Sequence, residues 1–306
     1  MAGVRTLTQG WVADRLPPRS PRAHKGTFGR VLVVAGSQEY AGAALLAGMG
    51  AARSGAGLVC LATPESVGLR LMGLVPELTA LLLAEEAPGL ASPVGWRRLA
   101  SEAPGYDAVV IGPGMGRHPS AQRRTRAFLG EMERPVVVDA DALNALAGAR
   151  AWWRPLRGSM VLTPHPGEFA RLRGEGGANP QVDDDLGEDD AARADAAAAA
   201  AIRWGKVVVL KGARSVIAAP DGEVLRSDVA TPALATAGSG DVLAGSIAAF
   251  LAAGCEPLAA AGCGVAVHGA AGLLAEDRIG RAGVIARDIA GLLPEAIEQL
   301  RGGRPR

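Results

Sequence analysis

Short β-branched or apolar runs alternate along this chain with longer Ala-rich segments of helical pattern. Strands and helices that alternate in this way build a mostly parallel sheet with helices on both faces. The expected strands span residues 30–35, 58–63, 108–111, 136–139, 160–163 and 207–210, followed by a hairpin of residues 215–219 and 223–226. The sequence therefore predicts an α/β fold in which residues 1–306 form a single domain.

Other segments have their own signatures. Helices are expected at residues 42–55 and 191–204, and the pattern after Gly238 is almost wholly helical. Residues 173–190 are rich in Gly, Asp and Glu, which predicts a surface loop. The Ala- and Gly-rich run 258–275 contains His268 and four glycines and lacks the Leu, Ile and Phe content that membrane insertion needs. We therefore expect that run to be a buried helix and the protein not to enter a membrane.

Charge and cysteine content exclude several functional classes. The formal net charge of +1, with scattered Lys and Arg, argues against binding to nucleic acid or to an acidic membrane surface. The chain has three cysteines, Cys60, Cys255 and Cys263, and their spacing is not that of metal ligands. An odd number of cysteines without such spacing fits core packing in a cytoplasmic protein better than a set of disulfides. Residues 4–30 are polar and Pro-rich without a continuous apolar core, so no signal peptide is expected.

Polar or Gly-rich stretches follow five of the expected strands. They are residues 36–43, 112–116, 139–141, 163–168 and 211–215. Ligands of open α/β sheets collect at the carboxyl ends of the strands. We therefore expect these five segments to line one crevice together with Asp241.

Asp241 stands at the end of a Gly-rich turn, Gly238-Ser-Gly-Asp241, that opens an apolar helical run. Such glycines let the backbone approach a ligand closely, and the first helical turn favours an anion. A carboxylate repels a phosphate, so Asp241 fits a base that takes a proton from an attacking hydroxyl. The alternative is that Asp241 caps a helix beginning at Val242. The turn alone leaves both interpretations open.

Eight motifs in this order resemble the ADP-dependent NAD(P)H-hydrate dehydratase family. They are Lys25-Gly-Thr-Phe-Gly29, Gly36-Ser37 with Tyr40-Ala-Gly-Ala43, Gly55-Ala-Gly-Leu58, Gly112-Pro-Gly-Met-Gly116, Asp139-Ala-Asp141, Thr163-Pro-His-Pro-Gly-Glu168, Lys211-Gly212 and Gly238-Ser-Gly-Asp241. The resemblance extends from about Lys25 to Ile297. It implies a ribokinase-like fold and a reaction in which the S epimer of hydrated NADH or NADPH (NADHX or NADPHX) is returned to NADH or NADPH. ADP is consumed, and AMP and phosphate are released.

The resemblance also implies cofactors and partners. Magnesium and ADP are expected with the hydrated dinucleotide, and a homo-oligomer, for which a tetramer is one candidate, is expected as the assembly. Many family members carry an epimerase domain ahead of this one. The motifs of this chain match only the dehydratase part, so we expect a separate epimerase to act on the same metabolite.

The roles of individual residues follow from the matched motifs. Asp241 is implied as the catalytic base, and Glu168 as a residue that organises magnesium through water. The implied substrate contacts are Ala43, Gly114, Gly116, His165 and Asp241. The implied nucleotide contacts are Lys211, Gly212, Ala213, Arg214, Ser215, Gly238, Ser239 and Gly240.

Several of these residues have ordinary structural interpretations as well. His165 could bond only to nearby backbone, Glu168 could be an acid facing the helix dipole, and Lys211 could extend to the surface. Ala43 and the two glycines could serve tight packing. Asp139 and Asp141 invite a metal interpretation, but a strand-ending Asp is as easily a helix cap, so we place both behind the ligand contacts.

The sequence departs from the family pattern at two positions, and one other family is a competing interpretation. Ser239 replaces the usual Thr and keeps the hydroxyl, whereas Thr231 stands where the family tends to carry Asn. The competing interpretation is a ribokinase-like kinase of a vitamin precursor, either hydroxymethylpyrimidine or hydroxyethylthiazole, which shares the Gly-x-Gly-Asp turn. His165, in place of the Asn common in those kinases, favours the dehydratase. A regulatory nucleotide-binding module without catalysis is disfavoured by the intact Asp241.

Overall fold

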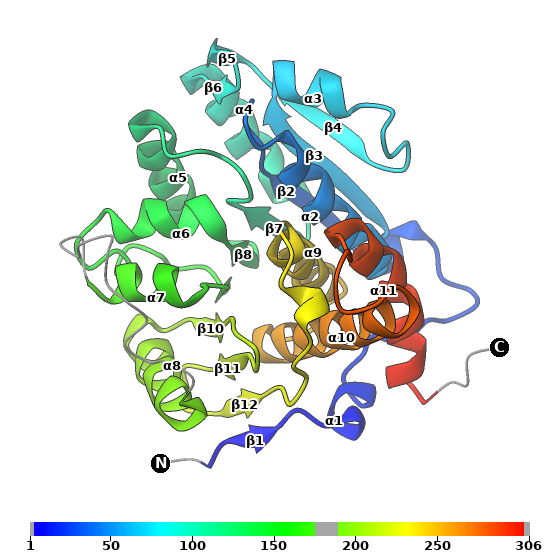
Figure 1. Cartoon of the computed structure of the whole chain (residues 1–306). Coiled ribbons are helices and arrows are strands. Elements are labelled where there is room, and N and C mark those ends of the chain that lie inside the picture. The colour runs from blue at the N-terminus through cyan, green and yellow to red at the C-terminus, as the bar shows by residue number, and fades with distance from the viewer. Residues whose placement is uncertain (1–2, 175–188, 303–306) are drawn as a thin grey trace.

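The computed structural model describes residues 3–174 and 189–302 (Figure 1). Most of the surface loop predicted at residues 173–190 therefore lies outside the described residues. Within them, ten strands form one sheet in the order β1-β12-β11-β10-β9-β8-β7-β2-β3-β4. The strands are β1 Arg5–Thr6, β2 Arg30–Val34, β3 Leu58–Pro64, β4 Thr79–Leu83, β7 Ala108–Ile111, β8 Val136–Val138, β9 Met160–Leu162, β10 Val207–Leu210, β11 Val216–Ala218 and β12 Val224–Arg226.

The sheet is mostly parallel, as the alternation of strands and helices predicts. Only the pairs β10–β11 and β11–β12 are antiparallel among the described strands of this sheet, and the second pair is the predicted hairpin. Each strand expected from the sequence is present to within one residue at either end. A separate antiparallel pair joins β5 Glu85–Ala87 to β6 Leu90–Ala91.

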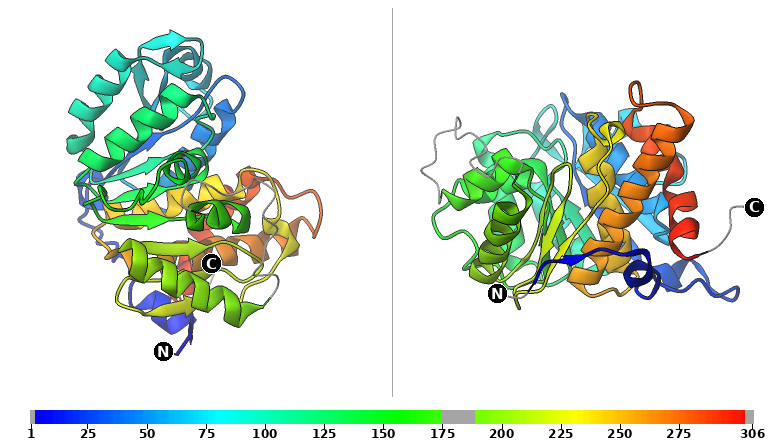
Figure 2. Two further views of the ribbon diagram at one scale, coloured as in Figure 1. Left: turned by 90° about the vertical axis from the view of Figure 1, so that its left-hand side faces the viewer. Right: turned by 60° about the horizontal axis from the view of Figure 1, so that its bottom comes forward.

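Helices cover both faces of the sheet, and Figure 2 shows the two layers from the side. Successive residues of β2 divide between the faces: Val31 and Val33 belong to one apolar core, and Leu32 and Val34 to the other. The first core includes α1 Gln9–Ala13, α2 Ala41–Arg53, α3 Glu65–Leu71, α9 Ser239–Ala252, α10 Pro257–Arg278 and α11 Ala286–Leu300. The second includes α4 Pro93–Glu102, α5 Pro119–Glu131, α6 Ala140–Ala147, α7 Pro166–Arg173 and α8 Asp190–Trp204. Short 3₁₀ helices span Lys25–Phe28, Ala103–Gly105 and Pro232–Leu234.

The apolar helix α10 is a core helix. Its length and composition would suffice to cross a membrane, but 72% of its most apolar window is buried inside the protein. The prediction of a buried helix is thus confirmed. Cys60 and Cys263 are buried, Cys255 is half-buried, and all three thiols are free.

Helices α2 and α9 pack closely side by side (Figure 1). A Cβ atom placed on Gly50 would lie 2.2 Å from the carbonyl oxygen of Val242, and one on Gly245 would lie 1.9 Å from that of Ala47. Neither position has room for a side chain. The two glycines therefore let the helix backbones approach each other and fix where the first turn of α9 lies.

Candidate active site

A pocket of about 700 Å³ opens where β9 and β10 end and α9 begins. Its walls are His165, Pro166, Lys211, Gly212, Ala213, Ser215, Ala230, Thr231, Pro232, Leu234, Ala235, Thr236, Ser239, Gly240, Leu243 and His268. Seven of the residues implied by the family motifs are among them. Of the five segments expected to line one crevice with Asp241, residues 163–168 and 211–215 contribute walls to this pocket, whereas residues 36–43, 112–116 and 139–141 and Asp241 itself are not among its walls.

Asp241 lies in the first turn of α9 and does not cap it. The helix begins at Ser239, and the N-cap position is Gly238, whose φ of +85° suits glycine. The alternative interpretation of Asp241 as the N-cap is therefore wrong. Burial, together with the carboxylates of Asp139, Asp141 and Glu168, raises the pKa of Asp241 to about 7, although Lys211 opposes the shift. A carboxylate with this pKa can accept a proton near neutral pH.

Lys211 is paired and does not extend to the surface. Its Nζ lies 2.8 Å from Asp139 Oδ1 and 3.9 Å from Glu168 Oε2, and only 20% of the side chain is exposed. Burial alone would lower the pKa of Lys211, but the two carboxylates raise it above its usual value. A Cβ atom on Gly240 would lie 3.3 Å from this Nζ. The ammonium group therefore lies beside the glycine turn and stays charged.

Asp139 has a larger part in the site than the sequence suggests. It occupies the N-cap position of α6, yet its carboxylate makes no capping hydrogen bond. Oδ1 instead accepts hydrogen bonds from Lys211 Nζ and from Thr163 Oγ1, both at 2.8 Å. The side chain is almost fully buried. Asp139 thus connects β8, β9 and β10 and fixes Lys211. The only signal of this role in the sequence is that Asp139 ends one predicted strand and Lys211 follows another.

Asp141 holds the Gly-rich loop that follows β7. Its Oδ2 accepts a hydrogen bond from the backbone N–H of Gly116 at 2.9 Å. In that loop a Cβ atom on Gly114 would lie 2.8 Å from the Cβ of Ala43. Ala43, Gly114 and Gly116 therefore gather in one place, although they are not among the walls of the 700 Å³ pocket.

His165 and Glu168 form a capping box at the start of α7. The Nδ1 of His165 accepts a hydrogen bond from Gly167 N–H, and the Glu168 carboxylate accepts one from His165 N–H at 2.8 Å. The local interpretations of both residues are thus realised. His165 nevertheless lines the pocket with half of its side chain exposed. Burial, with the charges of Lys211 and Arg171, lowers the pKa of His165 to about 4, so the imidazole is neutral at pH 7.

The charge balance around Lys211 suits a cation that arrives with a ligand. Among the described residues, no group of three or more His, Cys, Asp or Glu side chains could hold a metal ion. However, the carboxylates of Asp139, Glu168 and Asp241 all interact with a single ammonium group, that of Lys211. Magnesium commonly keeps several waters and is bound by one or two carboxylates and substrate phosphates. The residues present, Glu168 among them, fit that mode of binding.

Of three further residues, Thr231 and His268 line the pocket and Arg214 does not. Arg214 is not among the pocket walls, and its guanidinium pairs with Asp190 at 3.1 Å. Thr231 lines the pocket and donates a hydrogen bond to Glu276. In the sequence His268 is marked only as a polar residue in an apolar run, whereas in the structure it lines the pocket beside Ser239.

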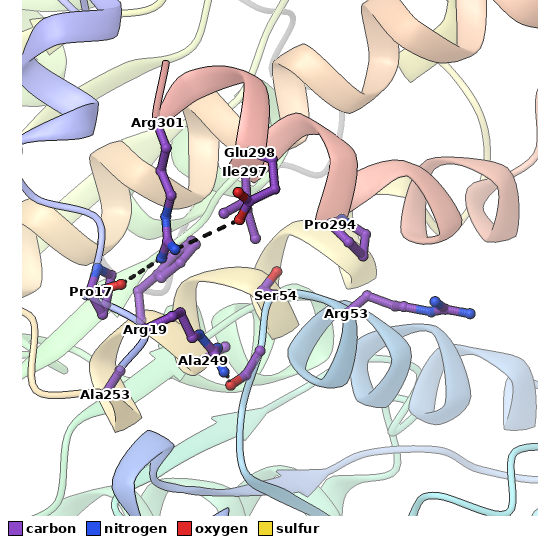
Figure 3. Close-up of a pocket in the computed structure, with 12 residues that line it drawn as sticks. Pro17, Arg19, Arg53, Ser54, Ala249, Ala253, Pro294, Ile297, Glu298 and Arg301 are labelled. Atoms are coloured by element: carbon purple, nitrogen blue, oxygen red, sulfur yellow. Dashed lines mark hydrogen bonds and ion pairs between the residues drawn. The ribbon is translucent and has the colours of Figure 1, made fainter. Parts of the chain in front are cut away.

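A second pocket, of about 230 Å³, lies at the opposite ends of α2 and α9 (Figure 3). Arg301 bonds there to the carbonyl of Pro17 and lies 3.7 Å from Glu298, while Arg53 points away from them. Arg19 donates to the carbonyl of Gly55. The hydrogen bonds of Arg19 and Arg301 to main-chain carbonyls account for the positions of these two side chains. The walls of this pocket lack the lysine–carboxylate cluster that lies beside the larger pocket.

Comparison with known proteins agrees with the geometry. The family model for NAD(P)H-hydrate dehydratase matches residues 31–295. A bifunctional NAD(P)H-hydrate repair enzyme of Moorella thermoacetica is 41% identical over 296 residues, covering 97% of this chain and 54% of that protein. The chain thus spans about half the length of such bifunctional relatives. An ADP-dependent (S)-NAD(P)H-hydrate dehydratase of Xanthomonas campestris is 40% identical over 304 residues. This match covers 99% of this chain and 100% of the Xanthomonas protein.

Solved structures lead to the same family. The Bacillus subtilis ADP/ATP-dependent NAD(P)H-hydrate dehydratase, co-crystallized with ATP and Mg²⁺, superposes with a TM-score of 0.81 at 33% identity, covering 98% of this chain and all of that one. A ribokinase-like superfamily protein of Enterococcus faecalis superposes with a TM-score of 0.79 at 24% identity over the whole of this chain and 98% of its own, which confirms the fold class. By sequence and by structure, the chain belongs to the NAD(P)H-hydrate dehydratase family.

Proposed function

We propose that this chain is an ADP-dependent dehydratase that returns (S)-NADHX or (S)-NADPHX to NADH or NADPH. One observation carries the proposal: a half-buried carboxylate, Asp241, with a pKa near 7 stands at an open helix N-terminus beside a charged lysine. A base and an anion site in one place are what phosphoryl transfer to a hydroxyl requires. The full-length match to the Xanthomonas dehydratase supports the choice of substrate and nucleotide.

The nucleotide phosphates would lie on the first turn of α9. Gly238 provides no side-chain cap, and the N–H of Gly240 is available to an anion at the positive end of the helix dipole, whereas the N–H of Ser239 donates to the carbonyl oxygen of Thr236 at 3.2 Å. Lys211, fixed by Asp139, adds a positive charge next to Gly240. Magnesium, when bound, would offset further negative charge on the transferring phosphate.

Asp241 would act on the hydroxyl of the hydrated nicotinamide ring. It takes the hydroxyl proton as the oxygen attacks the β-phosphorus of ADP, and the bond from that phosphorus to AMP breaks. The phosphorylated carbon then loses inorganic phosphate, with the electron pair of the ring nitrogen assisting. Loss of a proton from the neighbouring carbon completes the restored reduced cofactor.

The substrate would extend from the pocket to the loop of Gly114 and Gly116. His165 borders the pocket as a neutral imidazole whose Nδ1 accepts from Gly167 N–H, so Nε2 carries the hydrogen and can donate it to a ligand. Gly114 packs against Tyr40 and Ala43, because a Cβ atom on it would lie 2.7 Å from the carbonyl oxygen of Tyr40, so this glycine holds the loop close to the start of α2. We further propose a cytoplasmic location, a homo-oligomeric assembly and cooperation with an epimerase that acts on the same metabolite.

One incubation tests the proposal. Purified protein is mixed with hydrated NADPH, magnesium and either ADP or ATP, and the near-ultraviolet absorbance of NADPH is followed together with released phosphate. We expect one free phosphate for each cofactor restored, and AMP when ADP is used. The competing kinase interpretation predicts instead a stable phosphorylated pyrimidine or thiazole alcohol and no restored NADPH.

A further inference from the structure

The strongest feature outside the assigned roles is His268, in the middle of α10. It stands among apolar and small residues, and only 7% of it is exposed. A buried imidazole without hydrogen bonds would cost free energy. Its Nε2 lies 3.0 Å from Ser239 Oγ and 3.0 Å from the Ser239 carbonyl oxygen. One ring nitrogen thus contacts both the side chain and the backbone of the residue between Gly238 and Gly240.

The two contacts together determine where the protons lie. A carbonyl oxygen can only accept, so Nε2 carries the hydrogen and donates it. Nε2 then has no lone pair for the Ser239 hydroxyl, and Oγ can only accept from it as well. Burial, with the nearby charge of Lys211, lowers the pKa of His268 to about 4, so the ring is neutral at pH 7.

The hydroxyl proton of Ser239 must therefore point elsewhere. Ser239 and His268 both line the 700 Å³ pocket, together with Gly240 and Lys211. An anion on the first turn of α9 would meet the Ser239 hydroxyl as a donor in addition to the N–H groups. Resting on the function proposed above, we propose that His268 is a positioning residue that orients the Ser239 hydroxyl to donate to a phosphate of the nucleotide.

A double-mutant cycle read by ADP affinity tests this role. The Kd for ADP with Mg²⁺ is measured by calorimetry for wild type, His268→Leu, Ser239→Ala and the double variant, with thermal midpoints as the check on folding. We expect each single change to weaken ADP binding about tenfold, the effect of losing one hydrogen bond to a charged group. In the Ser239→Ala background, His268→Leu should cost less than about twofold, because its effect passes through the hydroxyl.

His268→Gln is the matched conservative variant, because its amide N–H can occupy the place of Nε2–H, whereas the shorter His268→Asn amide cannot reach Ser239. We expect Gln to retain ADP affinity to within about threefold and Asn to lose about tenfold. This pair decides the matter if His268→Leu does not fold. Equal losses from His268→Leu in both backgrounds, wild-type affinity in His268→Leu, or equal affinity of the Gln and Asn variants would overturn the proposal. Because ADP binding is measured directly, failure of wild type to restore NADPH would count against the proposed function alone.

Discussion

At the scale of single residues, the environment of Asp241 sets its chemistry. The other carboxylates of the site repel its charge, burial removes water, and Lys211 compensates only in part. We expect Asp241→Asn to lower turnover by about 10²-fold or more while ADP binding is largely kept, because the amide cannot accept the proton. Steady-state rates and calorimetry on the same preparation measure both quantities. Near-normal turnover in this variant would exclude Asp241 as the base.

The raised pKa of Asp241 also predicts two opposite dependences on pH. The base works only when ionised, so kcat/KM should rise with pH through about 7. A carboxyl whose pKa is about 7 in the folded protein and 3.8 in the unfolded chain binds more protons in the folded protein between those pH values. Its contribution to stability is therefore complete below about pH 4 and lost as pH rises through 7. Urea unfolding of wild type and Asp241→Asn at pH 5 and 8 should show the wild type losing more stability.

His165 and Lys211 are expected to contact different ligands, so changes at the two residues should affect the binding of different ligands. His165→Asn can keep the cap of α7 but lacks Nε2, so binding of hydrated NADPH should weaken about tenfold with the Kd for ADP unchanged. Lys211→Gln combined with Asp139→Asn removes the closest ion pair without leaving Asp139 as a buried carboxylate that has lost its lysine, and should weaken ADP binding alone. Calorimetric titration of both ligands against both variants measures this. Equal losses for the two ligands would mean that the residues act on the structure as a whole.

At the scale of elements, the close crossing of α2 and α9 aims the first turn of α9 at the pocket. Gly245→Ala would place a Cβ atom 1.9 Å from the carbonyl oxygen of Ala47, so the helices must separate. We expect a loss of about 1–3 kcal/mol in unfolding free energy, measured in urea. Gly291→Ala in α11 is the matched control, because a Cβ there meets nothing within 4 Å. That change should be neutral or stabilise by about 0.5–1 kcal/mol, owing to helix propensity. Equal stability of the two variants would show that the crossing is not tightly packed.

The elements also show how far sequence alone could go. Strands β2, β3 and β7 to β10 were predictable because β-branched runs buried on both faces are continuous and apolar. Strand β4, Thr79–Leu83, was missed because its Ala and Leu residues favour a helix as readily as a strand. The motifs predicted which loops meet at the site. They could not show that Asp139 pairs with Lys211, or that His268 contacts Ser239 from a helix 29 residues further on, because such pairs depend on packing between distant elements.

At the scale of the whole molecule, the site draws on both layers of the fold. Asp241, Ser239 and His268 come from helices on one face of the sheet, whereas Asp139 and His165 precede helices on the other. Lys211 follows strand β10 of the sheet between them. The two layers must therefore keep their relative position for the base, the lysine and the anion turn to converge. The proposed activity therefore requires both layers to be folded at the same time.

We propose that both layers unfold together as one domain. Trp11 lies in the core of one face and Trp96, Trp152 and Trp204 in that of the other, so Trp11→Phe leaves fluorescence dominated by the second layer. Far-ultraviolet circular dichroism reports the helices of both. We expect the two signals of this variant to follow one urea transition, and ADP with Mg²⁺ at 100 times its Kd to stabilise both by about 2.7 kcal/mol. Separate transitions, or an ADP effect on only one signal, would show that the layers fold independently and that the nucleotide stabilises only one of them.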